Sequence, residues 1–170
     1  DKVPFWAALD QVLDEANLSV NNYASEDGVS LIERPAGAAP RYGRASYTGP
    51  FRCEVTEVSA NRGLRLPTSK RLQLDLEIAW EPRLRPIAIS QPLDLVEAVD
   101  ESGNALTAAQ PGRVFQIEVQ QGVSATTISL PFELPERSVG AITRLRGAMT
   151  ALVAGQQHEF QFDDLASPTP

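Results

Sequence analysis

The feature that most constrains the fold of this chain is a set of short segments in which apolar and polar residues alternate. The clearest segment runs from Leu72 to Trp80, where leucine, isoleucine or tryptophan occupies every second position. Successive side chains of a β-strand point to opposite faces, so such a segment has one face for a core and one for water. Turn sequences such as Asn61-Arg62-Gly63 separate these segments. The pattern therefore predicts an antiparallel, mainly β protein.

Seven such strands are predicted in the part of the chain that follows residue 50. Seven strands in about 115 residues fit a seven-stranded antiparallel immunoglobulin-like sandwich in size, although the Cys…Trp…Cys core of antibody domains is absent. A sandwich is a scaffold for many activities and does not by itself indicate a function. The predicted strands are residues 51–59, 72–80, 93–99, 114–120, 127–134, 142–153 and 157–162.

A small module is predicted ahead of the sandwich. Residues 4–16 have helical periodicity, with Pro4 suited to the first turn and Asn17 to the C-terminal cap. Strands are predicted over residues 18–23 and 29–33, around a turn at Glu26-Asp27-Gly28. The expected apolar stripe of the helix consists of Phe5, Leu9, Val12, Leu13 and Ala16.

A Pro-, Gly- and Arg-rich segment separates the two parts. Residues 35–49 contain two prolines and three glycines, which leave little room for regular structure. The expected organisation is a helix–hairpin module over residues 1–34, a linker or loop over 35–49, and a β-sandwich over 50–170.

Charge and hydropathy restrict the partners. The net charge of −7 argues against nucleic acid, whose binding depends on phosphate neutralisation, and against an anionic membrane surface. No stretch has the roughly 20 apolar residues of a membrane span, so membrane insertion is not expected. The chain begins at Asp1 without an initiator methionine. We therefore expect that a signal peptide has been removed and that the protein is periplasmic, outer-membrane-associated or extracellular.

Residues that carry catalysis or bind metals are sparse. The single histidine, His158, has no nucleophile or further ligand near it in the sequence, and Cys53 falls in phase with a buried strand face. Asp100-Glu101-Ser102-Gly103-Asn104 resembles a polar hairpin turn more than a calcium loop. Asp75 and Glu77 fit the polar face of a strand, and Asp163-Asp164 fits a solvated tail. No catalytic residue, metal ligand or cofactor is predicted.

Arginine and tyrosine are concentrated near the linker and in a Pro-bounded loop. These residue types are frequent at the energetic centres of protein interfaces, because they cover area and also donate hydrogen bonds. Solvated loop charge explains the same residues without a function. The candidate binding residues are Arg34, Arg41, Tyr42, Arg44, Tyr47, Arg83 and Arg85.

The N-terminal segment also carries a family resemblance. Residues 3–20, with the helical run Val3-Pro4-Phe5-Trp6-Ala7-Ala8-Leu9, and then Gly28-Val29-Ser30-Leu31-Ile32, resemble about half of the secretin and TonB short N-terminal domain. The whole chain is similar to uncharacterised exported bacterial proteins that pair such a unit with a C-terminal sandwich. The resemblance implies an envelope setting and a protein-interaction role, and it supplies no catalytic residue.

The function predicted from the sequence is a non-catalytic protein-interaction or structural module of a bacterial envelope or exported protein, with another envelope protein as partner. The alternative is a carbohydrate-binding module, which would use exposed aromatic side chains. An exposed Trp80 would favour that alternative, and a deep pocket with converging carboxylates would favour an enzyme. The oligomeric state is left open.

Overall fold

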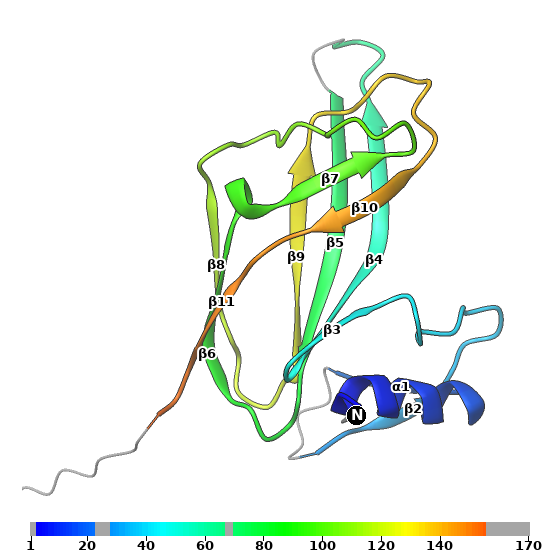
Figure 1. Cartoon of the computed structure of the whole chain (residues 1–170), viewed down its shortest axis with the longest axis vertical. Coiled ribbons are helices and arrows are strands. Elements are labelled where there is room, and N and C mark those ends of the chain that lie inside the picture. The colour runs from blue at the N-terminus through cyan, green and yellow to red at the C-terminus, as the bar shows by residue number, and fades with distance from the viewer. Residues whose placement is uncertain (1–2, 23–27, 67–69, 156–170) are drawn as a thin grey trace, which may run out of the picture.

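The computed structural model describes residues 3–22, 28–66 and 70–155 of the 170-residue chain. One α-helix is followed by a two-stranded hairpin and then by several antiparallel sheets (Figure 1). The mainly β structure and the N-terminal helix with its hairpin, both predicted from the sequence, are confirmed. The predicted strand 157–162, with His158 and Asp163-Asp164, lies outside the described residues.

The helix α1 (Phe5–Glu15) begins directly after Pro4, but it buries a different face from the one predicted. Phe5 and Val12, which the predicted stripe placed inside, are 39% and 60% exposed. The stripe was predicted from apolar residues alone, whereas the buried face includes the charged Asp10 and is centred on the large Trp6 ring. The buried side chains are those of Trp6, Ala7, Asp10 and Leu13.

The hairpin after the helix has the predicted order with shorter strands. β1 (Leu18–Val20) pairs antiparallel with β2 (Leu31–Glu33). The C-cap of the helix is Ala16 rather than the predicted Asn17, which follows it in a left-handed conformation with φ of 55°.

The largest sheet has the strand order β3-β4-β5-β9, and all of its pairs are antiparallel. β4 and β5 form a long hairpin, and β9 returns along the other edge of β5 (Figure 1). The strands are β3 (Ser46–Thr48), β4 (Phe51–Arg62), β5 (Lys70–Trp80) and β9 (Ala125–Phe132).

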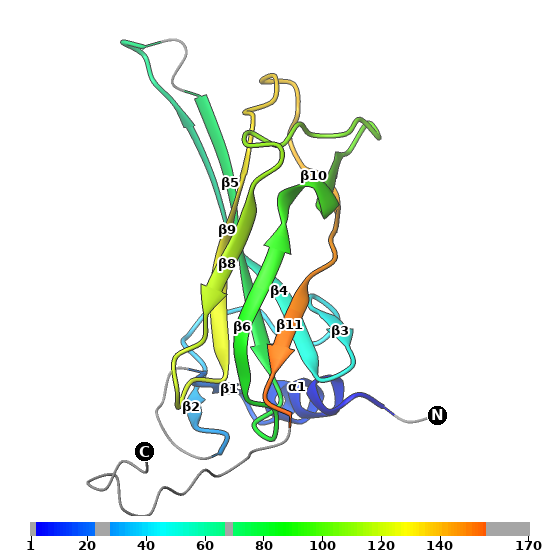
Figure 2. The ribbon, with the colours of Figure 1, turned by 90° about the vertical axis from the view of Figure 1, so that its left-hand side faces the viewer.

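Two smaller sheets lie in front of the largest one (Figure 2). One has the order β11-β6-β8, and the other pairs β10 with β7. A short 3-10 helix, Leu93–Leu95, separates β6 from β7. The strands are β6 (Pro86–Pro92), β7 (Glu97–Asp100), β8 (Val114–Glu118), β10 (Ile142–Arg146) and β11 (Thr150–Val153).

Two strand predictions are wrong in detail, and two strands were not predicted. The single strand predicted over 142–153 is two strands in different sheets, and the Gln91 side chain donates to the Ala148 carbonyl between them at 2.9 Å. The strand predicted over 93–99 is the 3-10 helix followed by β7. β6 was missed because prolines mark its two ends, and β3 was missed because it lies within the segment 35–49, for which no regular structure was predicted.

One core joins the largest sheet to the smaller ones. Its side chains come from β5 and β9 on one side and from β6, the 3-10 helix and β7 on the other, so the sheets pack with their apolar faces together. The buried members are Leu72, Leu74, Ile78, Trp80, Ile89, Leu93, Ala98, Ile128, Leu130 and Phe132.

A β-bulge at Thr56 keeps the apolar residues of β4 on one face. Val55 lies opposite Leu76 and Glu57 lies opposite Asp75, so Thr56 is the extra residue. Apolar side chains therefore stay on the core side, although they occupy odd-numbered positions up to Val55 and an even-numbered position at Val58. We call Phe51, Cys53, Val55 and Val58 the apolar row of β4. None of its members is fully buried, and Val58 is 58% exposed although its cross-strand partner Leu74 is 2% exposed.

The opposite face of β5 is only partly in water, which corrects the prediction of one solvated face. Glu77 and Ala79, expected on the polar side, are buried. The helix–hairpin module packs over them, and its apolar contacts with the sheet form a second core cluster. That cluster consists of Trp6, Leu13, Val20, Ala79 and Ala125.

Replacing Leu74 by Ala is expected to lower the free energy of unfolding by about 2–5 kcal/mol, because it leaves a cavity in the shared core. Replacing its cross-strand partner Val58 by Ala is expected to cost less than about 1 kcal/mol, since Val58 is largely exposed. Urea denaturation of the two variants measures the difference. An equal loss in both would mean that the apolar row is covered in solution.

Candidate functional site

Arg52 occupies the centre of a buried charged network between the helix and the largest sheet. Its guanidinium donates to the Asp10 carboxylate at 2.9 Å and to the Glu77 carboxylate at 3.0 Å. The Arg52 side chain is fully buried and stacks on the Trp6 ring, 4.6 Å from its centroid. The Trp6 indole in turn donates to the Pro50 carbonyl at 3.1 Å. A planar guanidinium suits this role, because it binds two carboxylates and an aromatic face at once.

Neighbouring side chains complete the network. The Tyr47 hydroxyl donates to the second Asp10 oxygen at 2.9 Å, and the Asn22 amide donates to Glu77 at 3.0 Å. Burial, and then the hydrogen bond to Asp10, raises the pKa of the Tyr47 hydroxyl above its usual range. The Arg41 guanidinium lies 3.6 Å from carboxylate oxygens of both Glu54 and Glu77. The network thus connects α1, β3, β4, β5 and the loop before β3.

Asp14, near the end of the helix, binds Arg34 and two backbone N–H groups of the segment 35–49. It pairs with the Arg34 guanidinium and accepts hydrogen bonds from the backbone N–H groups of Arg41 at 3.1 Å and Tyr42 at 2.8 Å. Burial alone would raise the pKa of this carboxyl. The three donors outweigh that effect and hold the pKa of Asp14 below its ordinary value.

The structure divides the seven candidate binding residues into two groups. Arg34, Arg41 and Tyr47 bond to the helix and the sheet, and so contribute to the architecture. Tyr42 and Arg44 lie on the surface of the same segment. Arg83 is also exposed and pairs with Glu81, while Arg85 lies at a cavity, as described next.

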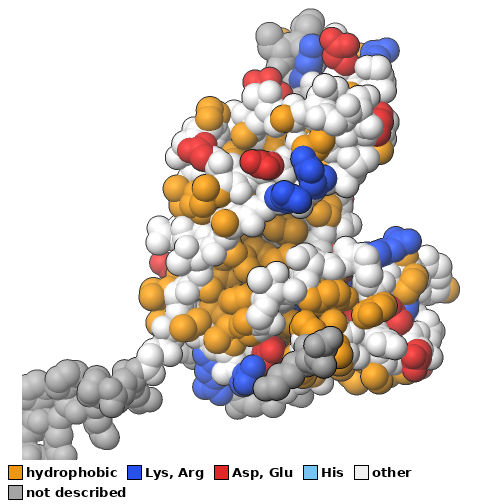
Figure 3. Space-filling model, viewed as in Figure 1, with side chains coloured by type: hydrophobic (Ala, Val, Ile, Leu, Met, Phe, Trp, Pro, Cys, Tyr) orange, Lys and Arg blue, Asp and Glu red, His pale blue; other side chains and the backbone are white. Residues whose placement is uncertain are grey.

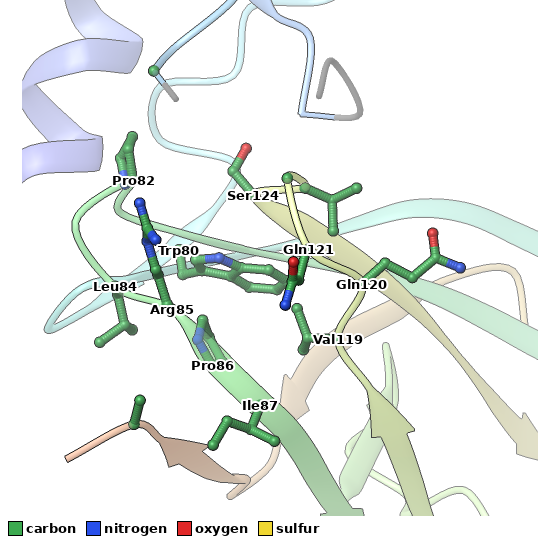
Figure 4. Close-up of a pocket in the computed structure, with 14 residues that line it drawn as sticks. Trp80, Pro82, Leu84, Arg85, Pro86, Ile87, Val119, Gln120, Gln121 and Ser124 are labelled. Carbon is green, nitrogen blue, oxygen red and sulfur yellow. The ribbon is translucent and has the colours of Figure 1, made fainter. Parts of the chain in front are cut away.

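That cavity, of about 470 Å³, opens at the end of the core between the β5–β6 loop and the β8–β9 loop. Figure 4 shows the Trp80 ring between the segment that carries Arg85 and Pro86 and the segment that carries Gln121. Its volume suits a small ligand. Trp80 is only 2% exposed, however, and no carboxylate lines the cavity in the described part of the chain. The arrangement offers neither a stacking platform nor an acid–base pair.

The apolar row of β4 is the other unusual surface. Its members share a face with the core, and Phe51 and Cys53 pack against the buried core cluster. In Figure 3, hydrophobic side chains gather in the middle of the face that is viewed. The sequence did not reveal this surface, because alternation predicts which residues share a face and not whether another strand covers them.

The residues considered for chemistry have structural partners. Asp100 accepts hydrogen bonds from the backbone N–H groups of Ser102 at 2.9 Å and Asn104 at 2.8 Å, as the predicted turn requires. Burial raises the pKa of the Cys53 thiol to about 11, so little of it is thiolate at neutral pH. Within residues 3–22, 28–66 and 70–155, no three His, Cys, Asp or Glu side chains are grouped as a metal site requires.

The described part of the chain also contains no helix of the length and apolarity needed to cross a bilayer. No family model matches the chain, and comparison with curated proteins and with solved structures gives no match either.

Replacing Arg52 by Ala is expected to lower the free energy of unfolding by about 3–5 kcal/mol, because it leaves two buried carboxylates without a counter-charge. Arg44→Ala is the matched control, with an expected change within about 0.5 kcal/mol, since Arg44 is exposed. Chemical denaturation measures both variants. Equal stability of the two would contradict the network.

Replacing Asp14 by Asn is expected to cost about 1 kcal/mol at neutral pH, because a charged acceptor of three hydrogen bonds becomes neutral. The pKa of Asp14 is lower in the folded chain than its ordinary value of 3.8. Its contribution is therefore complete above that value and disappears as pH falls through the folded pKa. Thermal unfolding of the wild type, Asp14→Asn and the exposed control Glu15→Gln tests this. A wild-type advantage that persists in strong acid would refute it.

Proposed function

We propose that this chain is a non-catalytic interaction module of a bacterial envelope or exported protein, and that it binds an extended segment of a partner protein along the apolar row of β4. The observation that carries the proposal is that this row shares a face with the core and is nevertheless accessible, with Val55 38% and Val58 58% exposed. Contiguous apolar surface of this kind commonly marks an interaction site.

The backbone around the row favours an extended partner. β3 pairs with β4 only over Phe51–Cys53, so within the described residues the outer edge of β4 has no neighbouring strand from Glu54 onward. β11 is likewise the last strand of its sheet in the described chain. A peptide in strand conformation gains main-chain hydrogen bonds at such an edge, and its alternate side chains contact the apolar face. The partner segment would therefore alternate apolar and polar residues.

The finer assignments of fold and setting belong to the same proposal. We propose that the packed sheets form an immunoglobulin-like sandwich, which is consistent with their shared core. The order of one helix and two antiparallel strands at the N-terminus is compatible with the resemblance to the secretin and TonB short N-terminal domain. That resemblance supports a periplasmic, outer-membrane-associated or extracellular location and another envelope protein as partner.

The carbohydrate-binding alternative has no observation in its favour. Trp6 is 1% exposed and Trp80 is 2% exposed, so neither presents a ring face to a sugar. Tyr42 and Arg44, which are exposed beside the helix, remain available to a protein partner.

The test is site-specific photo-crosslinking in cells. A photoreactive amino acid at Val58 is expected to give one or two discrete crosslinked proteins. The same amino acid at Val114, which is 52% exposed on β8, is expected to give none of them. Introducing Val55→Glu into the Val58 crosslinking protein is expected to lower the yield of the adducts at least about tenfold, because a charge would then face the apolar partner.

Three results would contradict the proposal. They are the absence of an adduct at Val58, the same adducts at Val58 and Val114, and adducts that survive Val55→Glu in a correctly folded protein. Circular dichroism of the purified variant establishes that it is folded.

A further inference from the structure

The far end of the β4–β5 hairpin combines exposed leucines with positive charge. Among the large apolar residues of the described chain, Leu64 is the most exposed at 91%, and Leu66 and Val3 follow at 66%. Arg65, Lys70 and Arg71 beside them are also exposed, and Arg62 is half-buried. We call these six residues the hairpin tip: Arg62, Leu64, Arg65, Leu66, Lys70 and Arg71.

The charge of the tip is opposite to that of the chain. Between Val58 and Leu74 the sequence has four cationic residues and no acidic residue, whereas the whole chain carries a net charge of −7. The net charge of the whole chain, which argued against an anionic membrane surface, therefore does not describe this end of the molecule.

The tip also stands away from the sheets. β9 pairs with β5 only as far as Leu72, opposite Phe132, so the hairpin continues beyond its last neighbouring strand. Figures 1 and 2 show this end extending past the strands that flank it. Its base touches the β9–β10 loop, where Arg62 donates to the Pro135 carbonyl at 3.4 Å. Glu133, Glu136 and Arg137 lie in the same stretch after β9 and together add a net charge of −1, which is small beside the four cations of the tip.

The acidic groups on the hairpin itself are distant from the tip. Glu57 and Asp75 face each other across β4 and β5; Glu57 lies five residues from Arg62, and Asp75 lies four residues from Arg71. Four residues of strand span about 13 Å. Charges in water are largely screened beyond about 8 Å at physiological ionic strength. A charged surface that approaches the tip therefore encounters mainly its cations.

We propose that the hairpin tip binds the surface of a membrane that contains anionic lipids. Leu64 and Leu66 enter the boundary between headgroups and acyl chains, and the four cations contact lipid phosphates. A protein partner fits less well, because a stable protein interface needs about 800 Å² on each side and the end of one hairpin presents a small convex surface. A bilayer needs no complementary shape. This inference is independent of the proposed partner site on β4.

Vesicle co-sedimentation of the purified chain tests the proposal. Vesicles of phosphatidylcholine are compared with vesicles in which about a third of the lipid is phosphatidylglycerol. Binding to the anionic vesicles is expected to be at least about tenfold tighter, and to weaken as salt is raised. Replacing both Leu64 and Leu66 by Ser, or Arg65, Lys70 and Arg71 together by Gln, is expected to lower the affinity at least about tenfold.

Matched controls come from exposed residues elsewhere in the chain. Val114→Ser with Leu152→Ser removes two apolar side chains that are 52% and 58% exposed, and Arg44→Gln with Arg83→Gln removes two exposed cations. These variants are expected to bind as the wild type does. Because all substituted side chains are exposed, the unfolding curves of the variants should match that of the wild type.

The proposal is overturned by any of four results. The first three are no binding to anionic vesicles, equal binding to both vesicle types, and an equal loss of affinity in the control variants. The fourth is binding that needs the cations but is unchanged without the leucines, since the cations would then adsorb to the surface without insertion of the leucines. Loss of vesicle binding with the Val58 crosslinks intact would separate the tip from the partner site.

Discussion

The structure depends on a buried arginine that two carboxylates share. Arg52 on β4 binds Asp10 of the helix and Glu77 of β5, which are 42 and 25 residues away in the sequence. Burying three charges is costly, so this arrangement is stable only when all of them are present in good geometry. Trp6 covers the guanidinium, Tyr47 donates to the second Asp10 oxygen, and Asn22 donates to the same Glu77 oxygen as Arg52. The N-terminal module is therefore fixed to the sheet at one orientation.

This anchoring gives the two halves of the β4–β5 hairpin different roles. Near Arg52 both faces of the sheet are buried, one in the shared core and the other beneath the helix–hairpin module. Beyond Thr56 the module no longer covers β4, and the opposing strands do not bury its apolar row. The hairpin tip lies in this second half, and so does Val58, the most exposed member of the apolar row. The first half supplies the rigidity that a binding surface needs.

Alternation in the sequence was sufficient to predict the mainly β class and the long strand β5, and helical periodicity followed by turn residues predicted the N-terminal helix with its hairpin. It failed where a residue acts through a distant partner. Asp10 was not part of the predicted apolar stripe of the helix, and Glu77 was predicted on the polar face of a strand, because periodicity assigns charges to water. Only the fold brings Arg52 between them. In the same way, Arg41 and Tyr47 were predicted as interface residues from their type, and the structure shows their bonds within the chain. The tip cations went unnoticed because net charge averages over the chain.

The sequence separation within the Arg52 network affects the order in which the chain can fold. The helix precedes Glu77 by more than sixty residues in the sequence, so its residues are synthesised well before those of β5. Until then Asp10 has neither Arg52 nor Glu77 beside it, and Trp6 lacks the guanidinium that covers it in the folded chain. An amphipathic helix of eleven residues is marginal in water without tertiary contacts. The helix is thus synthesised before the sheet strands but is among the last of the described elements to reach its final structure.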